Sequence, residues 1–301
     1  ITYTILNTIN AGLTTDTNYD PLNPDDVSVT NADDDAATLS INSIAVDEGN
    51  AGTTNFIFTV THSGAQVDGG YGVSFYTLNG TAKAPTDFAG NGGTVNFTTG
   101  AIGETQTITI VVNGDTAVES NETFSVVLNS VTAPGKDITI NPGGKTGVGT
   151  IINDDNATLS IDDETIIEGD SGTQTLTFTV TLDREVEDGL TVDYTTVDTS
   201  ATTADSDYVV SSGTLTFTGT AGETQTIDVT INGDEKVELD ETFLVNLSNI
   251  APVSAPGSAI TFADASAIGT ITNDDSAVIS ITGVTVNEDV GTADFTITMD
   301  K

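Results

Sequence analysis

A block of acidic and amide residues, set directly between two strand-like segments, occurs three times in this 301-residue chain. The copies read Asn31-Ala-Asp-Asp-Asp-Ala-Ala37, Asn153-Asp-Asp-Asn-Ala157 and Asn273-Asp-Asp-Ser-Ala277. The alanines that open the following strands are 120 residues apart both times. This period is too long for a solenoid unit and suits a whole domain. We therefore expect tandem domains, each with its own core.

The repeat sets the expected domain boundaries. Two complete repeats are expected at residues 36–155 and 156–275. Residues 1–35 match the C-terminal part of a preceding repeat, although the match is short and imperfect, and residues 276–301 match the first two strands of a following one. We interpret the chain as a window on a longer array of repeats.

The body of each repeat alternates apolar and polar residues, as short strands do. Phe56, Phe58 and Val60 share one face of such a segment, and the second repeat carries the same pattern at residues 176–180. No segment shows a sustained period of 3.6 residues. About seven strands in roughly 115 residues, separated by turn signals, predict an all-β fold in which each repeat is an antiparallel β-sandwich.

The first strand of each repeat changes its alternation once. Leu39 and Ile41 occupy odd positions, whereas Ile44 and Val46 occupy even ones. The same change recurs in the next two copies, after Ile161 and after Ile281 in turn. A β-bulge that lets one strand leave one sheet and join the other would produce this pattern.

The charge balance excludes several partners. The chain has 45 acidic and six basic residues, for a net charge of −39. Nucleic acid and anionic membrane surfaces are therefore poor partners, and no apolar run approaches the roughly 20 residues needed for insertion into a bilayer. Cysteine is absent, so neither disulfides nor thiolate ligands are available. Close packing of such acidic domains requires metal cations, high salt or a basic partner.

Acidic residues recur in register between the two complete repeats. In the first repeat they are Glu48, Asp87, Asp115, Glu119, Glu122, Asp154 and Asp155, and in the second Glu168, Asp207, Asp234, Glu238, Glu241, Asp274 and Asp275. In a seven-stranded sandwich the loops that carry them can all lie at one pole. Two like charges 4 Å apart repel by roughly 4 kcal/mol at an effective dielectric near 20, so a divalent cation is expected between them. Oxygen ligands in irregular loops favour Ca²⁺ over Mg²⁺.

These residues also have simpler interpretations than a metal site. The carboxylates could form a solvated acidic surface, as on proteins from salty habitats, but other acids such as Asp162 and Asp163 do not recur in register. The pair Glu119 and Glu122 could suggest a glycosidase, yet the chain has 6% aromatic residues and no tryptophan to line a substrate cleft. His62, the only histidine, has Leu182 as its counterpart. We expect no enzyme.

Several spaced motifs together resemble the Calx-beta domain, which sodium/calcium exchangers and many large bacterial surface proteins contain. The motifs are Val46-Asp-Glu-Gly49, Gly80-Thr-Ala82, Thr86-Asp-Phe88, Gly103-Glu-Thr-Gln-Thr-Ile108, the Asp115/Glu119/Glu122 loop and Gly149-Thr-Ile-Ile-Asn-Asp-Asp155. The resemblance covers essentially the whole chain. It implies an immunoglobulin-like sandwich that binds Ca²⁺ at its distal pole.

The resemblance places the family's calcium ligands on the same fourteen acidic residues, and Asp33, Asp34 and Asp35 keep a full acidic triplet for the preceding copy. The chain departs from the family pattern at two kinds of position. Gly114 and Gly233 stand where a fully equipped member has an aspartate, and Asn153 and Asn273 replace an acid at the junction. Some ion sites are therefore expected to be lost or weakened, although turn chemistry explains the two glycines equally well.

Three functions are compatible with these features. The leading hypothesis is an extracellular or cell-surface structural and adhesive rod, stiffened by Ca²⁺ at each junction, because the linker is short and charged rather than rich in Gly, Ser or Pro. Its partners would be calcium ions, neighbouring repeats of the same chain, and a cell-surface or matrix ligand. The alternatives are a calcium-sensing regulatory module of a membrane protein, and a filament in which copies of the chain associate.

Overall fold

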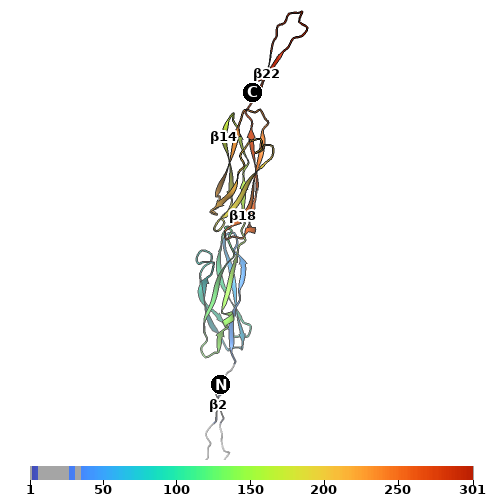
Figure 1. Cartoon of the computed structure of the whole chain (residues 1–301). Coiled ribbons are helices and arrows are strands. Elements are labelled where there is room, and N and C mark those ends of the chain that lie inside the picture. The colour runs from blue at the N-terminus through green and yellow to red at the C-terminus, as the bar shows by residue number, and fades with distance from the viewer. Residues whose placement is uncertain (1, 6–26, 31–34, 301) are drawn as a thin grey trace, which may run out of the picture.

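The chain forms two β-sandwiches that follow each other along one axis (Figure 1). The computed structural model describes residues 2–5, 27–30 and 35–300. Each sandwich pairs a four-stranded sheet with a five-stranded sheet. The all-β fold predicted from the alternation of apolar residues is confirmed. Among the described residues, no helix has the length and apolarity that crossing a bilayer requires.

The first sandwich contains nine strands within residues 35–155. They are β3 (Ala37–Ile41), β4 (Ile44–Asp47), β5 (Gly52–Gly64), β6 (Tyr71–Asn79), β7 (Gly92–Phe97), β8 (Thr105–Gly114), β9 (Glu122–Thr132), β10 (Ile138–Ile140) and β11 (Thr146–Ile152). The sheets have the orders β10-β3-β5-β8 and β4-β11-β9-β6-β7. A single 3-10 turn, η1 (Pro142–Gly144), precedes β11.

The second sandwich repeats this arrangement within residues 156–275. Its strands are β12 (Ala157–Ile161), β13 (Glu164–Ile167), β14 (Gly172–Leu182), β15 (Leu190–Asp198), β16 (Ser212–Phe217), β17 (Thr224–Gly233), β18 (Glu241–Pro252), β19 (Ile260–Phe262) and β20 (Ser266–Thr272). The sheet orders are β17-β14-β12-β19 and β13-β20-β18-β15-β16, and η2 (Gly257–Ala259) matches η1.

The predicted exchange of sheets is present in both sandwiches. β3 lies in the four-stranded sheet and β4 in the five-stranded sheet, and β12 and β13 divide in the same way. The expected count of about seven strands was too low, for two reasons. The exchange splits the first strand into two, and β10 and β19 add a short strand that pairs in parallel with β3 and β12. Three-residue strands of this kind carry too little alternation to be recognised in a sequence.

An aromatic stack in the core fixes the loop before β7. Phe88 and Phe124 are fully buried and stack with their ring centroids 4.4 Å apart, and Tyr208 and Phe243 do the same in the second sandwich. Gly149 lies over this stack, where a β-carbon would come within 2.6 Å of the Phe124 ring. Because Phe88 is held in the core, the preceding residue, Asp87, is held at the surface of the sandwich.

The recurrent Gly-Glu-Thr-Gln-Thr motif closes a turn. Glu104 accepts hydrogen bonds from the backbone N–H groups of Thr98 at 2.7 Å and Gly100 at 2.7 Å. Glu223 accepts from Thr218 and Gly219 in the same way. These carboxylates satisfy turn N–H groups that no strand pairs. This part of the family signature is therefore structural.

Two hairpins lie outside the sandwiches. β1 (Thr2–Ile5) pairs with β2 (Val27–Thr30), and β21 (Val278–Thr282) pairs with β22 (Thr296–Asp300), both in antiparallel fashion. The exchange of sheets expected after Ile281 is absent from the described residues, since no strand is assigned between Thr282 and Thr296. The described residues there form a single two-stranded sheet, which gives a strand no second sheet to join. That residues 1–35 and 276–301 belong to further repeats stays a proposal.

Candidate calcium site

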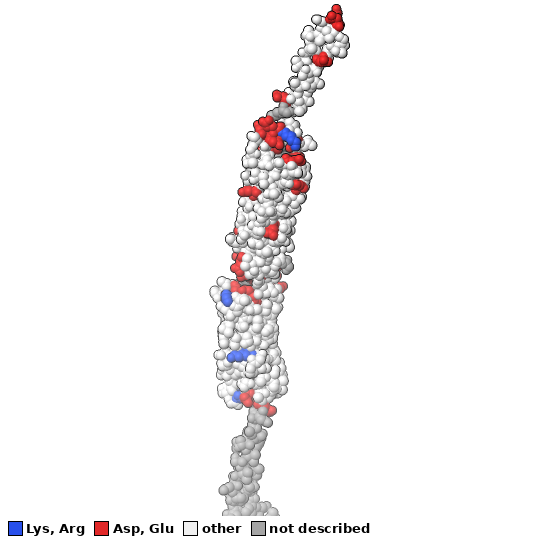
Figure 2. Space-filling model, in the orientation of Figure 1, with Lys and Arg blue, Asp and Glu red and all other residues white. Residues whose placement is uncertain are grey.

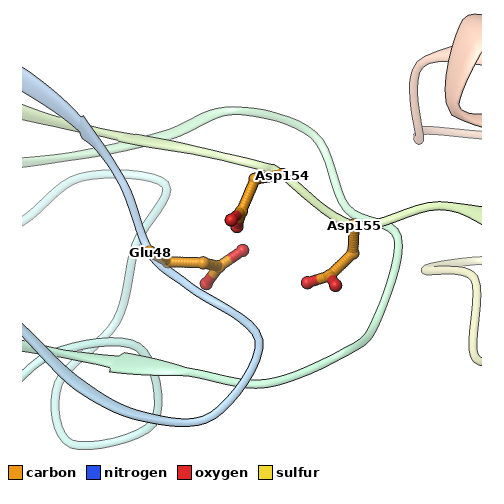
Figure 3. Close-up of side chains that lie close together, drawn as sticks. All are labelled: Glu48, Asp154 and Asp155. Atoms are coloured by element: carbon orange, nitrogen blue, oxygen red, sulfur yellow. The ribbon is translucent and has the colours of Figure 1, made fainter.

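The carboxylates of Glu48, Asp154 and Asp155 converge at one end of the first sandwich (Figure 3). Glu48 follows β4, and the two aspartates follow β11, which pairs with β4 in parallel. One oxygen of each residue lies within 4.8 Å of the others. Parallel pairing of the two strands brings their ends to the same place. We call this end of each sandwich the acidic pole.

A second group of carboxylates lies beside the first at the same pole. Asp87 comes from the loop before β7, Glu119 from the loop between β8 and β9, and Glu122 from the first position of β9. Glu122 lies close enough to Asp87 to be repelled by it, and Glu119 lies close enough to Asp115 and Asp87 to be repelled by both. All seven acids that the sequence singled out in this repeat therefore lie at one pole.

The second sandwich builds the same two groups. Glu168, Asp274 and Asp275 converge within 4.8 Å, and so do Asp207, Glu238 and Glu241. Asp234 lies close enough to Glu168 to repel it. Figure 2 shows acidic side chains gathered at this pole and at the junction of the two sandwiches on the face in view. Among the described residues, the only cation near the acidic pole of the second sandwich is Lys236, which forms an ion pair with Glu238.

Burial and mutual repulsion raise the pKa of several of these glutamates. Burial, followed by repulsion from Glu119 and Asp115, raises the pKa of Glu48 to about 8. Burial, together with neighbouring carboxylates, raises the pKa of Glu119, Glu122, Glu168 and Glu241 to about 7. Such shifts mean that the folded chain holds these charges at a cost unless a cation or a proton neutralises them.

The chemistry of the cluster fits a hard divalent cation. Asp155 is 1% exposed and Glu168 is 5% exposed, yet Asp155 Oδ2 and Glu168 Oε1 accept no hydrogen bond. A buried carboxylate oxygen without a partner costs free energy, and metal coordination removes that cost. Every side chain that converges here offers oxygen. Oxygen is the ligand that Ca²⁺ and Mg²⁺ prefer, whereas softer transition metals prefer nitrogen or sulfur.

The raised pKa values predict how stability depends on pH when calcium is chelated. The folded-state pKa of Glu48 is about 8 against an ordinary value of 4.5, so the folded chain binds more protons than the unfolded chain between these pH values. The stability that the protonated glutamates contribute is then fully present below about pH 4.5, and it is lost as the pH rises through their folded-state pKa values of about 7 to 8. We expect the melting temperature in chelator to fall over this interval. Excess calcium should abolish the fall, and a melting temperature that rises with pH in chelator would contradict the prediction.

The two departures from the family pattern have structural explanations. A β-carbon on Gly114 would lie 1.9 Å from the carbonyl oxygen of Gly49, and one on Gly233 would lie 2.1 Å from that of Gly169. Glycine is therefore required by close packing of two backbones. This favours the turn interpretation over a lost ligand at both positions.

The asparagines at the junctions hold the acidic loops in place. Asn153 Oδ1 accepts a hydrogen bond from the backbone N–H of Glu119 at 3.0 Å, and its Nδ2 donates to the carbonyl oxygen of Asp155 at 3.1 Å. Asn273 makes the same two contacts with Glu238 and Asp275. An amide can donate and accept at once, whereas an ionised carboxylate can only accept. The asparagine that replaces the acid therefore positions the loop that carries the first of the glutamates.

Sequence reasoning missed the residues that the second sandwich brings to the acidic pole of the first. Arg184 Nη1 lies 3.8 Å from Asp155 Oδ1, and Glu187 Oε2 accepts from the backbone N–H of Ser120 at 3.5 Å. Glu185 and Glu187 also repel Glu119. The short β14–β15 connection carries no metal-binding motif, so only the contact between the two sandwiches could have revealed these residues.

The acidic triplet predicted for a preceding copy is only partly visible. Asp33 and Asp34 lie outside the described residues. Asp35 is exposed and lines a surface hollow of about 440 Å³ at the other end of the first sandwich, together with Val67, Pro134 and Lys136. Its role as a ligand stays a prediction.

Comparison with known proteins identifies the domain type. The family model described as "Calx-beta domain" matches residues 31–156 and 153–276. The crystal structure of CBD12 from CALX1.2 is similar at 20% sequence identity and a TM-score of 0.36, over 77% of this chain and 99% of that one. The apo-form Calx CBD1 domain is similar at 24% identity and a TM-score of 0.35, over 40% and 99%. No curated protein sequence matches the chain. On the two family matches, the chain belongs to the Calx-beta family, with two Calx-beta domains in tandem.

Proposed function

We propose that this chain is a calcium-binding segment of an extracellular structural or adhesive rod. Calx-beta domains are calcium-binding modules, and they are typically not catalytic. The observation that carries the proposal is the acidic pole, where buried carboxylates converge and Asp155 keeps an oxygen without a hydrogen-bond partner. The first such pole lies at the junction with the next sandwich.

The proposed ligands are the acidic residues that recur in register. In the first sandwich they are Glu48, Asp87, Asp115, Glu119, Glu122, Asp154 and Asp155, and in the second Glu168, Asp207, Asp234, Glu238, Glu241, Asp274 and Asp275. At six to eight oxygens per Ca²⁺, each set suffices for roughly two or three ions when loop carbonyls take part. The separation into two groups at each pole supports more than one ion per pole.

Calcium would act on the angle between the sandwiches. Glu185 and Glu187 of the second sandwich face the carboxylates of the first. Among the described residues, Arg184 is the only cation in contact with those carboxylates. Without a cation, the like charges repel across the junction. A bound ion reverses the sign of that interaction and holds the two sandwiches together at their junction. The rod would therefore be stiffer with calcium than without it.

Removing one carboxylate tests the site. Glu48→Gln is expected to weaken calcium binding to the first sandwich by roughly tenfold or more, because it deletes a charged ligand. In chelator the same variant is expected to melt at a higher temperature than the parent, because one repelling charge is gone. Titration calorimetry measures the first effect and thermal melting the second.

Glu168→Gln is the matched variant in the second sandwich and should affect only the other set of ions. Unchanged calcium binding in both variants would contradict the proposal. The measured affinity also distinguishes the alternatives. A structural module outside the cell needs only about 10⁻⁴ to 10⁻³ M, whereas micromolar binding would favour a calcium-sensing regulatory module. Electron microscopy of native material separates a single thread from a filament of associated chains.

A further inference from the structure

The loop between β8 and β9 of the first sandwich is built into the second sandwich. Val118, in this loop, is fully buried and belongs to the hydrophobic core of the second sandwich. Its backbone N–H donates to the carbonyl oxygen of Glu185 at 2.9 Å, and the N–H of Glu187 donates back to the carbonyl oxygen of Val118 at 2.9 Å. These bonds form a parallel bridge between Val118 and Val186. Ser120 Oγ adds a hydrogen bond to the carbonyl oxygen of Ser254.

The equivalent loop of the second sandwich has the same internal structure. The backbone N–H of Lys236 donates to Asp234 Oδ1 at 2.7 Å, as that of Ala117 does to Asp115 Oδ1 at 2.8 Å. Glu238 is held by Asn273 as Glu119 is by Asn153. The conformation that presents the valine is therefore formed by contacts within the loop and its own sandwich.

This second loop presents apolar side chains to solvent. Val237, the counterpart of Val118, is 49% exposed, and Leu239, the counterpart of Ser120, is 85% exposed. Both lie among acidic residues that keep the rest of the pole polar. A loop held in its docking conformation, with its apolar side chains uncovered, has the properties of an interface that lacks its partner.

The receiving surface is a feature of this type of sandwich. Val186 is held by a hydrogen bond from its N–H to the carbonyl oxygen of Gly219 at 2.8 Å, and Val67 makes the same bond to Gly100 at 2.9 Å. Val186 is 1% exposed beneath Val118, whereas its counterpart Val67 is only partly buried and lines the hollow at the corresponding end of the first sandwich. Both complete sandwiches thus carry an edge valine ready to pair with an incoming loop.

We propose that Val237 and Leu239 dock into a third Calx-beta sandwich that begins at Ser276, through the same parallel bridge that joins the first two. The chain runs from Asp275 through one residue into Ala277, just as it runs from Asp155 through Asn156 into Ala157. So short a connection holds the next sandwich at the pole and gives it a high effective concentration there. The proposal concerns packing between sandwiches and does not depend on calcium.

The second joint differs from the first in one respect. Leu239 cannot donate the hydrogen bond that Ser120 gives to Ser254. The third sandwich must therefore offer an apolar contact at that point, where the second sandwich offers a carbonyl oxygen. This difference would let each sandwich prefer its own neighbour in the array.

A chain with three sandwiches tests the docking. It is made by inserting a second copy of residues 156–275 after Asp275 of the full chain, so that the inserted copy supplies the receiving surface of Val186. The middle sandwich carries Leu239→Ser, so that its loop matches the Ser254 carbonyl oxygen of that surface. Val237→Asp is introduced only in the middle sandwich, and the measurements are made in chelator. We expect the variant to lower the melting midpoint of the inserted sandwich by about 5 °C and to make small-angle scattering report a more flexible particle.

Val237→Asp in a 301-residue chain that also carries Leu239→Ser is the matched control. Because Val237 is half exposed there, its melting midpoint should stay within about 2 °C of the parent's. A drop confined to the three-sandwich chain supports the docking. An equal effect in both chains, or no effect in either, overturns it. Since no calcium is present, neither result bears on the proposed calcium site.

Discussion

Calcium added to the chelated chain is expected to raise the melting temperature by about 10 °C. At a calcium concentration 100 times the dissociation constant, binding to the folded state alone contributes roughly 2.7 kcal/mol per site. For sandwiches of this size, 1 kcal/mol shifts the midpoint by roughly 3–5 °C. The effect is large because calcium both binds and offsets the burial and the repulsion that together raise the pKa of Glu48 to about 8. Differential scanning calorimetry at pH 7.5 measures the shift.

The same titration, followed by small-angle scattering, should show a narrower distribution of shapes with calcium than without it. Magnesium at equal concentration serves as the control, because it keeps its waters and demands octahedral geometry that this irregular cage does not impose. The double variant Glu48→Gln and Glu168→Gln should lose most of the thermal shift. If the parent chain melts at the same temperature and keeps the same shape with and without calcium, the proposed function is wrong.

Val118→Asp should uncouple the two sandwiches and destabilise the second one. Burial of a valine side chain contributes roughly 1.5–3 kcal/mol, and the substitution also places a charge in an apolar core. Val118 is fully buried against the core of the second sandwich, although it belongs to the first. We expect the melting midpoint of the second sandwich to fall by roughly 5–10 °C and that of the first to change little.

Val237→Asp provides the control for this variant, because it makes the same chemical change at the equivalent position of an exposed loop. It should leave both transitions in place. Scattering should show greater flexibility for Val118→Asp than for Val237→Asp. A second sandwich that melts normally in the Val118→Asp variant would show that its core does not need the loop of its neighbour.

Much of the fold could be predicted because its signals are local. Alternation placed Phe56 and Phe58 inside, and both are fully buried. The change of phase between Ile41 and Ile44 predicted the exchange of sheets, since side chains on one strand point to opposite faces in turn. The gathering of the acidic residues at one pole followed from the order of loops in a sandwich.

What the sequence did not reveal depends on contacts between distant segments. The backbone approach that requires Gly114 joins it to Gly49, 65 residues away in the chain. Val118 looks like an ordinary loop residue until the second sandwich is placed on it. Glu187 has no motif that marks it as a neighbour of Glu119. Such contacts arise only when whole sandwiches are assembled.

The parallel pairing of β4 with β11, and of β13 with β20, has a mechanical consequence. The chain enters each sandwich through one strand, β3 or β12, that leads into the first strand of the pair, and it leaves just after the second. When the two ends of the rod are pulled apart, these strands slide along each other, so four paired positions on each resist the force at the same time instead of separating one by one. A chain of such sandwiches is suited to bear tension along its length.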